Sequence, residues 1–512
     1  MSPIVRRIRG NVHGSIDITR LEDLVISHPF FQRLRRVRQL AFLHYVFPGA
    51  THTRFEHSLG VMHLAGVAWR KLYENQKNLK SSLESFVDFD AVESQMHPDS
   101  MVHGLISPTL KNIESIFESP YIKQSLRLAA LLHDLGHPPF SHTGEKILPT
   151  YKELLEANPG CPDYLKDYLE SRCSLLMCKG KDPSNIRVRH EILSVMMVDT
   201  LLNDVYANNE IQMEDQVDPR DVIAIIIPDI EPETSSPLVN ANAHRLCREL
   251  LSGELDIDRM DYLLRDSREC GVVYGIFDAG RIFDSICLYY DPEDKDFHIA
   301  IGFSGLAAFE DYLRARHSMY LQLYFHKTSV GAEAMMQQIV KVLGGFSLPP
   351  NIKEYAKYDE FNIGATLLEA GDSLKQEKRE ELGQLVSGLL YNRNLWKRVY
   401  EVTGPSLSDV ECQSLTAAME LLKKSGITFE QISSSGSLTR FSPREEHQKS
   451  VNSLRLIKKD ARQMPRVWPI EDFLQVMKIN ETTFINRLYV SPKDADEKGA
   501  RGLIQSELNR EQ

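Results

Sequence analysis

The sequence predicts a mainly α-helical protein with one small antiparallel β-hairpin and a mixed, mostly helical C-terminal region. Three observations support this class. Apolar residues recur at helical spacing in several long stretches, two strand-like segments flank a turn-rich sequence, and no internal repeat is found. A chain of 512 residues is too long for one small core, so we expect more than one structural region, at ~100–200 residues each.

Each predicted element has its own local signal. The segment LRLAALLHDL is apolar at nearly every position, as in a buried helix, and the following Gly136 ends it. The strand-like segments 286–290 and 297–301 are joined by the turn-rich DPEDKD, which predicts the hairpin. The predicted helical stretches are 55–72, 126–135, 191–202, 250–264 and 305–342.

The charge pattern becomes mixed and repeat-free beyond about residue 330. We therefore divide the chain into a core region, 1–330, and a C-terminal mixed α/β region, 331–512. No motif within 331–512 indicates a chemistry of its own.

Composition excludes several classes of protein. With 60 Lys and Arg against 71 Asp and Glu, the net charge of −11 argues against a general nucleic-acid coat protein. The first residues lack the apolar core of a secretory signal, and no apolar run approaches the ~20 residues of a membrane span. The seven cysteines are scattered and fit reduced thiols, so we expect a cytoplasmic protein without membrane contact.

The acidic total conceals a basic segment. Residues 1–60 hold nine arginines, no lysine and four acids, a local charge of +5. Eleven of the 17 histidines lie within the first 142 residues. Histidine is the commonest metal ligand and titrates near neutrality, so this clustering indicates chemistry in the N-terminal part.

The adjacent pair His133-Asp134 is the central feature. By itself such a pair fits a helix end that caps the last turn. Within a strongly apolar helix, however, burying an ionisable pair is costly unless it has a partner, and a divalent cation supplies one. Other segments offer further ligands: RFEHSLG, HPPFSH and ELDIDRMDYLLRD.

Together these motifs resemble a known family. RFEHSLG, LLHDLGHPPFSHTGE, RHE and LDIDRMDYLLRDS, in this order, are similar to the HD-domain deoxynucleoside triphosphate (dNTP) triphosphohydrolases, which include the bacterial dGTPase-like enzymes and a mammalian enzyme. The resemblance runs from about residue 10 to residue 327 and is supported by QRLRRVRQL and FPGATHTRFEHS upstream. It implies an HD-domain helical core.

The resemblance implies that His57, His133, Asp134 and Asp258 bind a metal. Two imidazoles and two carboxylates suit a borderline divalent ion, Fe, Mn, Zn or Ni, with positions left for water or phosphate. Magnesium is expected, if at all, with the substrate phosphates.

The catalytic neighbours follow from the same correspondence. His142 is the expected general acid, and Glu145 orients it or shares its proton. His137 and His190 are expected to bond the α-phosphate and its developing charge. His190 alone would also fit a residue at a helix start.

Substrate binding is implied for a further group of residues. Arg54, Arg259 and Arg316 would bind the triphosphate, with Tyr262 beside them. Most family members have lysine where this chain has Arg259, a change that keeps the charge. The remaining substrate contacts would be Gln39 and Asp266 to the 3′-hydroxyl and Tyr324 to the base.

Regulation and assembly are expected from the family as well. Gln32, Arg35 and Lys327 match positions that contact a nucleotide activator bound between subunits. The acidic residue that reads guanine is Ser27 here, which argues against a guanine activator and leaves open another nucleotide or none. A homo-oligomer, with a tetramer favoured, is expected, and region 331–512 would serve assembly or regulation.

The sequence thus predicts metal-dependent hydrolysis of dNTPs to deoxynucleoside and inorganic triphosphate, by water attack at the α-phosphorus. Two alternatives stay open. One is another HD phosphohydrolase, a nucleotidase or phosphodiesterase. The other is a nucleic-acid-binding protein with a vestigial HD site, which the acidic net charge and the intact ligand types disfavour.

Overall fold

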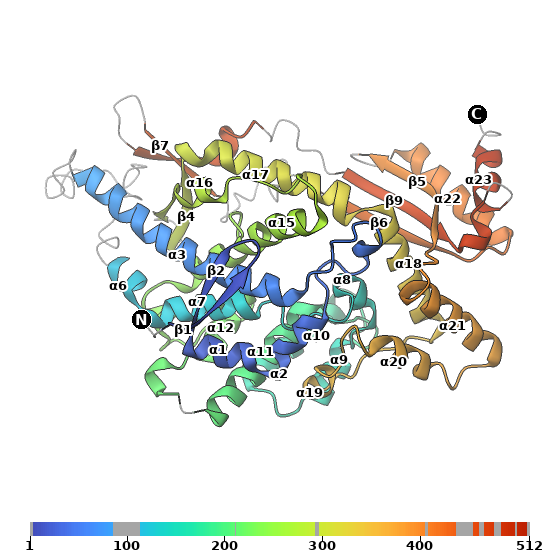
Figure 1. The fold of residues 1–512 in the computed structure, drawn as a ribbon, viewed down its shortest axis with the longest axis horizontal. Helices are drawn as coiled ribbons and strands as arrows, with labels where there is room; N and C mark the ends of the chain where they lie inside the picture. The colour runs from blue at the N-terminus through green and yellow to red at the C-terminus, as the bar shows by residue number, and fades with distance from the viewer. Residues whose placement is uncertain are drawn as a thin grey trace.

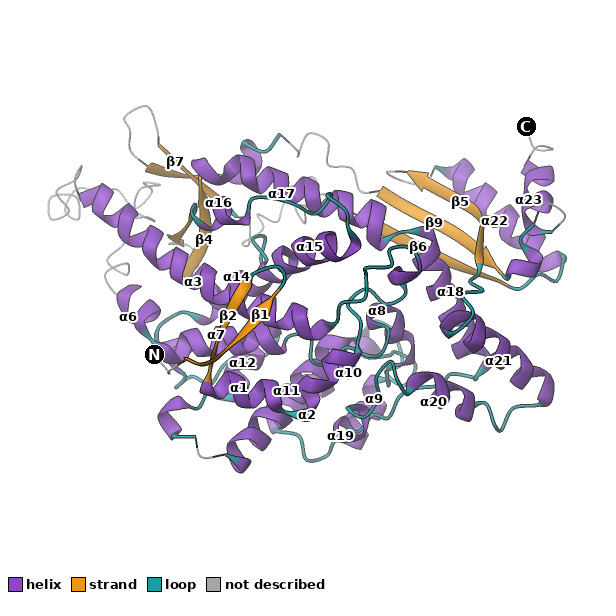
Figure 2. Cartoon of the chain, viewed as in Figure 1, coloured by secondary structure: helices purple, strands orange, loops and turns teal. Residues whose placement is uncertain are grey.

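Helices make up most of the described chain, and small sheets pack beside them (Figures 1 and 2). The computed structural model describes residues 4–84, 113–209, 211–291, 296–404, 408–436, 454–459, 465–475, 483–496 and 499–508. The mainly α fold class with a mixed C-terminal region is confirmed. Within the described residues, no helix combines the length and apolar character that crossing a bilayer would need.

The helices up to residue 270 are α1 Arg20–Ser27, α2 Pro29–Arg33, α3 Arg54–Glu84, α6 Ile113–Glu118, α7 Pro120–Leu132, α8 Ser141–Gly144, α9 Tyr151–Ala157, α10 Asp163–Cys178, α11 His190–Asn208, α12 Pro219–Ile226, α13 Pro237–Asn240, α14 His244–Ser252 and α15 Ile257–Cys270. Those after it are α16 Ala279–Phe283, α17 Leu306–Met319, α18 Lys327–Val342, α19 Ile352–Tyr355, α20 Ile363–Ala370, α21 Gln376–Leu390, α22 Asp409–Lys424 and α23 Ala500–Leu508.

Two predicted helical stretches are wrong in their continuity. The stretch 250–264 is divided between α14 and α15, because Gly253 ends the first helix and Asp256 caps the second by accepting the backbone N–H of Arg259 at 3.0 Å. The stretch 305–342 is divided as well. After α17 the chain makes a π-helical turn, Tyr320–Tyr324, and His326 then caps α18.

The predicted hairpin is confirmed and belongs to a larger sheet. Strands β3 (Ile286–Asp291) and β4 (Asp296–Gly302) pair antiparallel, with Ile286 opposite Ile301. The centre of its turn, 292–295, lies outside the described residues. Strand β4 also pairs in parallel with β7 (Arg455–Lys459), which pairs with β8 (Pro465–Pro469).

Two further sheets were not predicted. At the N-terminus, β1 (Ile4–Gly10) and β2 (Gly14–Thr19) form a hairpin in which Gly10 faces Gly14, and Gly14 closes the turn at φ 72°. In the C-terminal region, β5 (Lys397–Gly404), β9 (Thr483–Val490) and β6 (Phe429–Gly436) form an antiparallel sheet with β9 in the centre. That sheet, α22 and α23 share a separate small core around Leu422, Leu488 and Val490.

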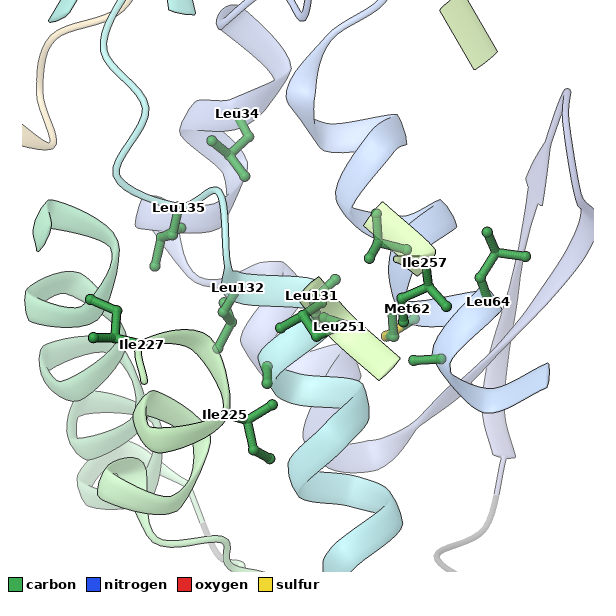
Figure 3. Close-up of a cluster of buried hydrophobic side chains, with 14 of the residues drawn as sticks. Leu34, Met62, Leu64, Leu131, Leu132, Leu135, Ile225, Ile227, Leu251 and Ile257 are labelled. Carbon is green, nitrogen blue, oxygen red and sulfur yellow. The ribbon is translucent and has the colours of Figure 1, made fainter. Parts of the chain in front are cut away.

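The main core encloses the helix that carries the His-Asp pair. Figure 3 shows the side chains of Leu131, Leu132 and Leu135 among apolar residues from α3, α12, α14 and α15. All three leucines are fully buried. Their partners labelled there include Met62, Ile225, Leu251 and Ile257. This packing fixes the end of α7, where His133 and Asp134 emerge.

Residues from both predicted regions, before and after residue 330, bind the turn that follows Asp134. Buried Arg33 donates to the carbonyl oxygens of Leu135 (3.3 Å) and His137 (2.6 Å). The hydroxyl of Tyr355 donates to the carbonyl oxygen of Gly136 (2.7 Å). A Cβ at Gly136 would lie 2.2 Å from the backbone nitrogen of Ser194 on α11, so this turn requires glycine. The boundary at 330, which stays a prediction, falls inside α18.

Glu360 links the same two regions through the loop that leads to His142. It accepts the backbone N–H of Arg38 at 2.8 Å and that of Phe140 at 3.3 Å. Burial raises the pKa of the Glu360 carboxyl to about 7, an effect that the backbone donors and the Arg38 charge only partly oppose.

This raised pKa predicts a pH-dependent stability. The folded state binds the Glu360 proton more tightly than the unfolded state, so its contribution is complete below pH ~4.5 and is lost as pH rises to about 7. Glu360→Gln should reduce the loss of unfolding free energy between pH 5 and pH 8 by about 2–3 kcal/mol, at 1.36 kcal/mol per pKa unit. Urea titrations at several pH values measure this difference.

The matched control is Glu354→Gln, because Glu354 is exposed and, within the described part of the chain, its carboxylate pairs only with Lys357 on the same surface. We expect the control to keep the pH dependence of the wild type. An unchanged dependence in Glu360→Gln would contradict the assignment.

Candidate active site

Two histidines and two aspartates from three segments converge at the centre of the helical core. His57 is fully buried on α3, and its Nε2 lies 2.9 Å from Oδ1 of Asp258 on α15 and 3.5 Å from Oδ2 of Asp134. His133 caps α7, and its Nε2 lies 3.3 Å from the same Asp258 oxygen and 3.5 Å from Oδ1 of Asp134. The predicted ligand quartet is thus one cluster.

In both rings, a hydrogen bond from Nδ1 fixes the tautomer. Nδ1 of His57 donates to Oδ2 of Asp261 at 2.8 Å, and Nδ1 of His133 donates to the carbonyl oxygen of Ala130 at 2.9 Å. Each Nε2 therefore faces the carboxylates and offers them a proton or, once deprotonated, offers a lone pair to a cation. Both Nε2 atoms are buried and have no hydrogen-bond partner among the described residues.

Lone pairs and carboxylates facing one another in a buried site attract a cation. Burial lowers the pKa of His57, but Asp258 and Asp261 outweigh it and raise this pKa to about 10. The pKa of Asp258 is lowered despite its burial, because Nε2 of His57 and Nε2 of His133 both lie beside its Oδ1. The same field that draws a proton to Nε2 favours a metal ion. Imidazole and carboxylate donors in this number suit a borderline divalent metal.

Asp261 is a functional residue that sequence reasoning missed. Its carboxylate is fully buried and also accepts two bonds from Arg265, at 2.8 and 2.9 Å, which hold its pKa well below the usual range. Asp261 follows Asp258 by three residues on α15, so both reach the same side of the helix. That spacing, in the motif DIDRMDY, was the available signal.

Arg54 also lies beside the cluster of predicted metal ligands. It is buried on α3, pairs with Asp134, and donates from Nε to the hydroxyl of Ser141 at 3.0 Å. Its charge is the main opponent of burial at Asp134, whose pKa is held well below its usual range. Arg54 thus keeps a predicted metal ligand ionised, besides the expected phosphate contact.

The four predicted catalytic neighbours form a second cluster beside the first. Oε1 of Glu145 lies 3.2 Å from Nδ1 of His142 and 2.6 Å from Nδ1 of His190. The rings of His137 and His190 stack at 3.6 Å, and Nε2 of His137 lies 3.3 Å from Oδ1 of Asp134. The two clusters therefore meet at Asp134.

The chemistry of this second cluster differs from residue to residue. The His142 side chain is 71% exposed, whereas His137 is fully buried. Burial together with the Arg54 charge holds the pKa of His137 well below its usual range, so this ring is neutral. Glu145 stays ionised, because its bonds to His142 and His190 lower its pKa against the effect of burial. Nitrogens of the three histidines lie within 4.8 Å of one another, close enough to share a cation.

Two predicted phosphate-binding arginines are buried and incompletely paired. Arg259 bonds Asp256 at 3.1 Å, but its Nη1 has no hydrogen-bond partner in the described part of the chain. The same holds for Nε and Nη1 of Arg316, whose guanidinium lies 5.8 Å from the ring of Tyr320. The hydroxyl of Tyr262 lies 3.3 Å from that of Tyr320. Buried, unsatisfied guanidinium groups are strong candidates for anion binding.

The predicted sugar and base contacts also meet. Asp266 is buried and accepts from Nε2 of His52 and from the hydroxyl of Tyr324, both at 2.8 Å. The backbone N–H of Gln39 donates to the carbonyl oxygen of His52 at 3.0 Å, and the Gln39 side-chain oxygen is buried without a described partner. His52 is a second residue that sequence reasoning missed, although it stands in the motif FPGATHTRFEHS.

The three candidate regulatory residues fall in two places. Gln32 accepts from Arg35 at 2.9 Å, and Arg35 lies 3.5 Å above the ring of Phe55. Lys327 instead lines a cleft of about 530 Å³ at the C-terminal sheet. The charged residues lining that cleft are Lys327, Arg393, Lys397, Arg398, Arg501 and Glu401.

Comparison with known proteins matches part of the chain to a family model. The HD domain model matches residues 113–266, a span that contains His133, Asp134 and Asp258. His57 on α3 lies before the matched span.

Curated relatives match over most of the chain at low identity. A protein of Homo sapiens named deoxynucleoside triphosphate triphosphohydrolase SAMHD1 is 25% identical over 421 residues, 77% of this chain and 55% of its own length. The uncharacterized protein YwfO of Bacillus subtilis is 27% identical over 310 residues, 60% of this chain and 49% of its own length. The chain thus spans about half the length of these relatives.

Solved structures share the fold. A phosphohydrolase from Bacteroides thetaiotaomicron superposes with a TM-score of 0.58 at 22% identity, covering 95% of this chain and 99% of that one. A hypothetical protein from Aquifex aeolicus gives 0.59 at 21% identity, covering 98% and 99%. Residues 113–266 thus match the HD domain model, and most of the chain is similar, at about 25% identity, to proteins named deoxynucleoside triphosphate triphosphohydrolase.

Proposed function

We propose that this protein hydrolyses deoxynucleoside triphosphates to deoxynucleoside and inorganic triphosphate, in a reaction that requires one divalent metal ion. The observation that carries the proposal is that two clusters meet at Asp134. On one side of it lie the predicted metal ligands His57, His133 and Asp258. On the other side lie His137 and the pair of histidines that contact Glu145, which are His142 and His190. The names of the SAMHD1 relatives support the substrate class.

The four ligands would hold Fe, Mn, Zn or Ni, and magnesium would accompany the substrate phosphates. When bound, such a metal supplies an acidified water and polarises a phosphoryl oxygen. The chain contributes the rest. His57 and His133, whose Nδ1 atoms are held by Asp261 and Ala130, would give up the proton on Nε2 to bind the ion, and Arg54 keeps Asp134 ionised beside them.

Bond cleavage at the α-phosphorus also needs a proton for the departing 5′-oxygen. His142 is the proposed donor, because its Nδ1 lies 3.2 Å from Oε1 of Glu145, which orients the ring, and its side chain is largely exposed to an incoming substrate. His137 is buried and neutral and would bond the α-phosphate together with His190.

Substrate recognition would use the buried polar groups that lack partners in the described chain. Arg259 and Arg316 would bind the triphosphate through their unpaired guanidinium nitrogens. Gln39 and Asp266 would bond the 3′-hydroxyl, and Tyr324, which bonds Asp266, would border the base. A tight apolar wall beside C2′ would exclude ribonucleotides.

A nucleotide activator is a second proposal, on a different surface. The cleft at Lys327 has five cationic side chains and a single acidic one, which favours an anionic ligand such as a triphosphate. Gln32 and Arg35 remain candidates for the same role in an assembly, for which a tetramer is favoured. Solution mass measurements with and without dATP test the assembly.

The products provide the first test. We expect dNTPs, but not NTPs, to yield deoxynucleoside and intact triphosphate in the presence of Mn²⁺. In ¹⁸O-labelled water the label should enter the triphosphate, because water attacks phosphorus and the 5′-oxygen leaves with the sugar. Mass spectrometry of both products measures this. Label in the nucleoside, or release of pyrophosphate with dNMP, would contradict the proposal and indicate another HD phosphohydrolase.

Two histidine substitutions, one at the proposed general acid and one as its control, test the role of His142. His142→Ala should lower kcat by about 10²–10⁴-fold while metal content is unchanged, because it removes a proton donor and not a ligand. The control is His244→Ala, since His244 also pairs with a carboxylate, Glu231 at 3.4 Å, but lies outside both clusters. Equal kcat values for the two variants would refute the role of His142.

A further inference from the structure

The tip of the N-terminal hairpin reaches the metal cluster through one histidine. His13 stands in the turn between β1 and β2, and its Nε2 lies 2.6 Å from Oδ1 of Asp261 on α15. The His13 side chain is 9% exposed. The contact therefore joins the N-terminal hairpin, whose strand β1 is largely exposed, to the fully buried carboxylate that orients His57.

Asp261 has a complete set of donors only when His13 is present. Its Oδ2 accepts from Nδ1 of His57 and Nε of Arg265, both at 2.8 Å, and its Oδ1 accepts from Nη2 of Arg265 at 2.9 Å and from His13. Each carboxylate oxygen thus receives two hydrogen bonds. An ionised carboxylate only accepts, so His13 donates from Nε2.

The other hairpin contacts orient the tip. Asn11 bonds Glu269 and accepts from Nη1 of Arg265 at 3.4 Å. The ring of His63 on α3 stacks on His13 at 5.4 Å between centroids, with 26° between the planes. Among the described residues, only His13 and Arg265 donate to Oδ1 of Asp261, the oxygen that does not bond His57.

We propose that His13 is a positioning residue of the metal centre, which holds Asp261 so that the carboxylate fixes the ring of His57 with Nε2 toward the metal. The N-terminal hairpin is then part of the metal site, although the hairpin supplies no ligand. Replacing a carboxylate that bonds and orients a metal-bound histidine lowers metal affinity by about 10–100-fold. His13 acts one bond further out, so we expect the lower end of that range.

The inference rests on the proposed metal site and is tested without nucleotide. Metal-free protein is titrated with Mn²⁺ at constant pH, and free Mn²⁺ is measured by electron paramagnetic resonance. His13→Ala should weaken Mn²⁺ binding by about 10-fold, whereas His13→Gln, which keeps an N–H donor, should stay within about 3-fold of the wild type. His63→Gln is the matched control, because it replaces the stacked ring and keeps the donor to Asp261, and should bind as the wild type does.

Melting of the metal-free proteins separates positioning from folding. The proposal requires weaker Mn²⁺ binding in His13→Ala at an unchanged melting temperature, or, if that variant melts early, restored binding in His13→Gln. Wild-type affinity in His13→Ala, or equal losses in His13→Gln and His63→Gln, would overturn the role of His13 and leave the metal site intact. Failure of the wild type to bind Mn²⁺ would instead overturn the metal site itself, and the inference with it.

Discussion

The structure depends on two imidazole lone pairs and two carboxylates that face one another inside a helical core. Nε2 of His57 lies 2.9 Å from Oδ1 of Asp258, and Nε2 of His133 lies 3.3 Å from the same oxygen. Neither Nε2 has a hydrogen-bond partner among the described residues. Arg54 offsets the charge of Asp134, but burying the second carboxylate, Asp258, is costly without a further cation. A cation at this point resolves the conflict, and the surrounding residues make sense as the means of holding it there.

The scaffold reaches this point from distant parts of the chain. Arg33 and Tyr355 bind the carbonyl oxygens of the turn that follows Asp134, and Gly136 allows α11 to approach that turn. Glu360 binds the backbone of the loop before His142. The region after residue 330 therefore contributes to the geometry of the site, in addition to any role in assembly.

The sequence predicted the parts whose signals are local. The last turns of helix α7 are apolar at nearly every position, and the His133-Asp134 pair that follows is anomalous there, so the sequence alone indicated the centre of the site. The break between α14 and α15 was missed because helical periodicity continues across Gly253, although a glycine followed by the capping residue Asp256 was a usable signal. The N-terminal hairpin was missed because β1 is largely exposed and lacks alternating apolar residues. The spacing of Asp258 and Asp261 places both on one side of α15, but the contacts of Asp261 with His13 on the β1–β2 turn and His57 on α3 are long-range, and that spacing alone does not predict them.

The metal content of the purified protein tests the central claim most directly. Anaerobically prepared wild-type protein, His133→Ala and Asp258→Asn are compared by inductively coupled plasma mass spectrometry, with His244→Ala as the control outside the site. We predict one divalent transition-metal ion per chain in the wild type and the control, and its loss in the two site variants. Equal metal content in all four proteins, or a wild type that hydrolyses dNTPs without any metal, would contradict the account.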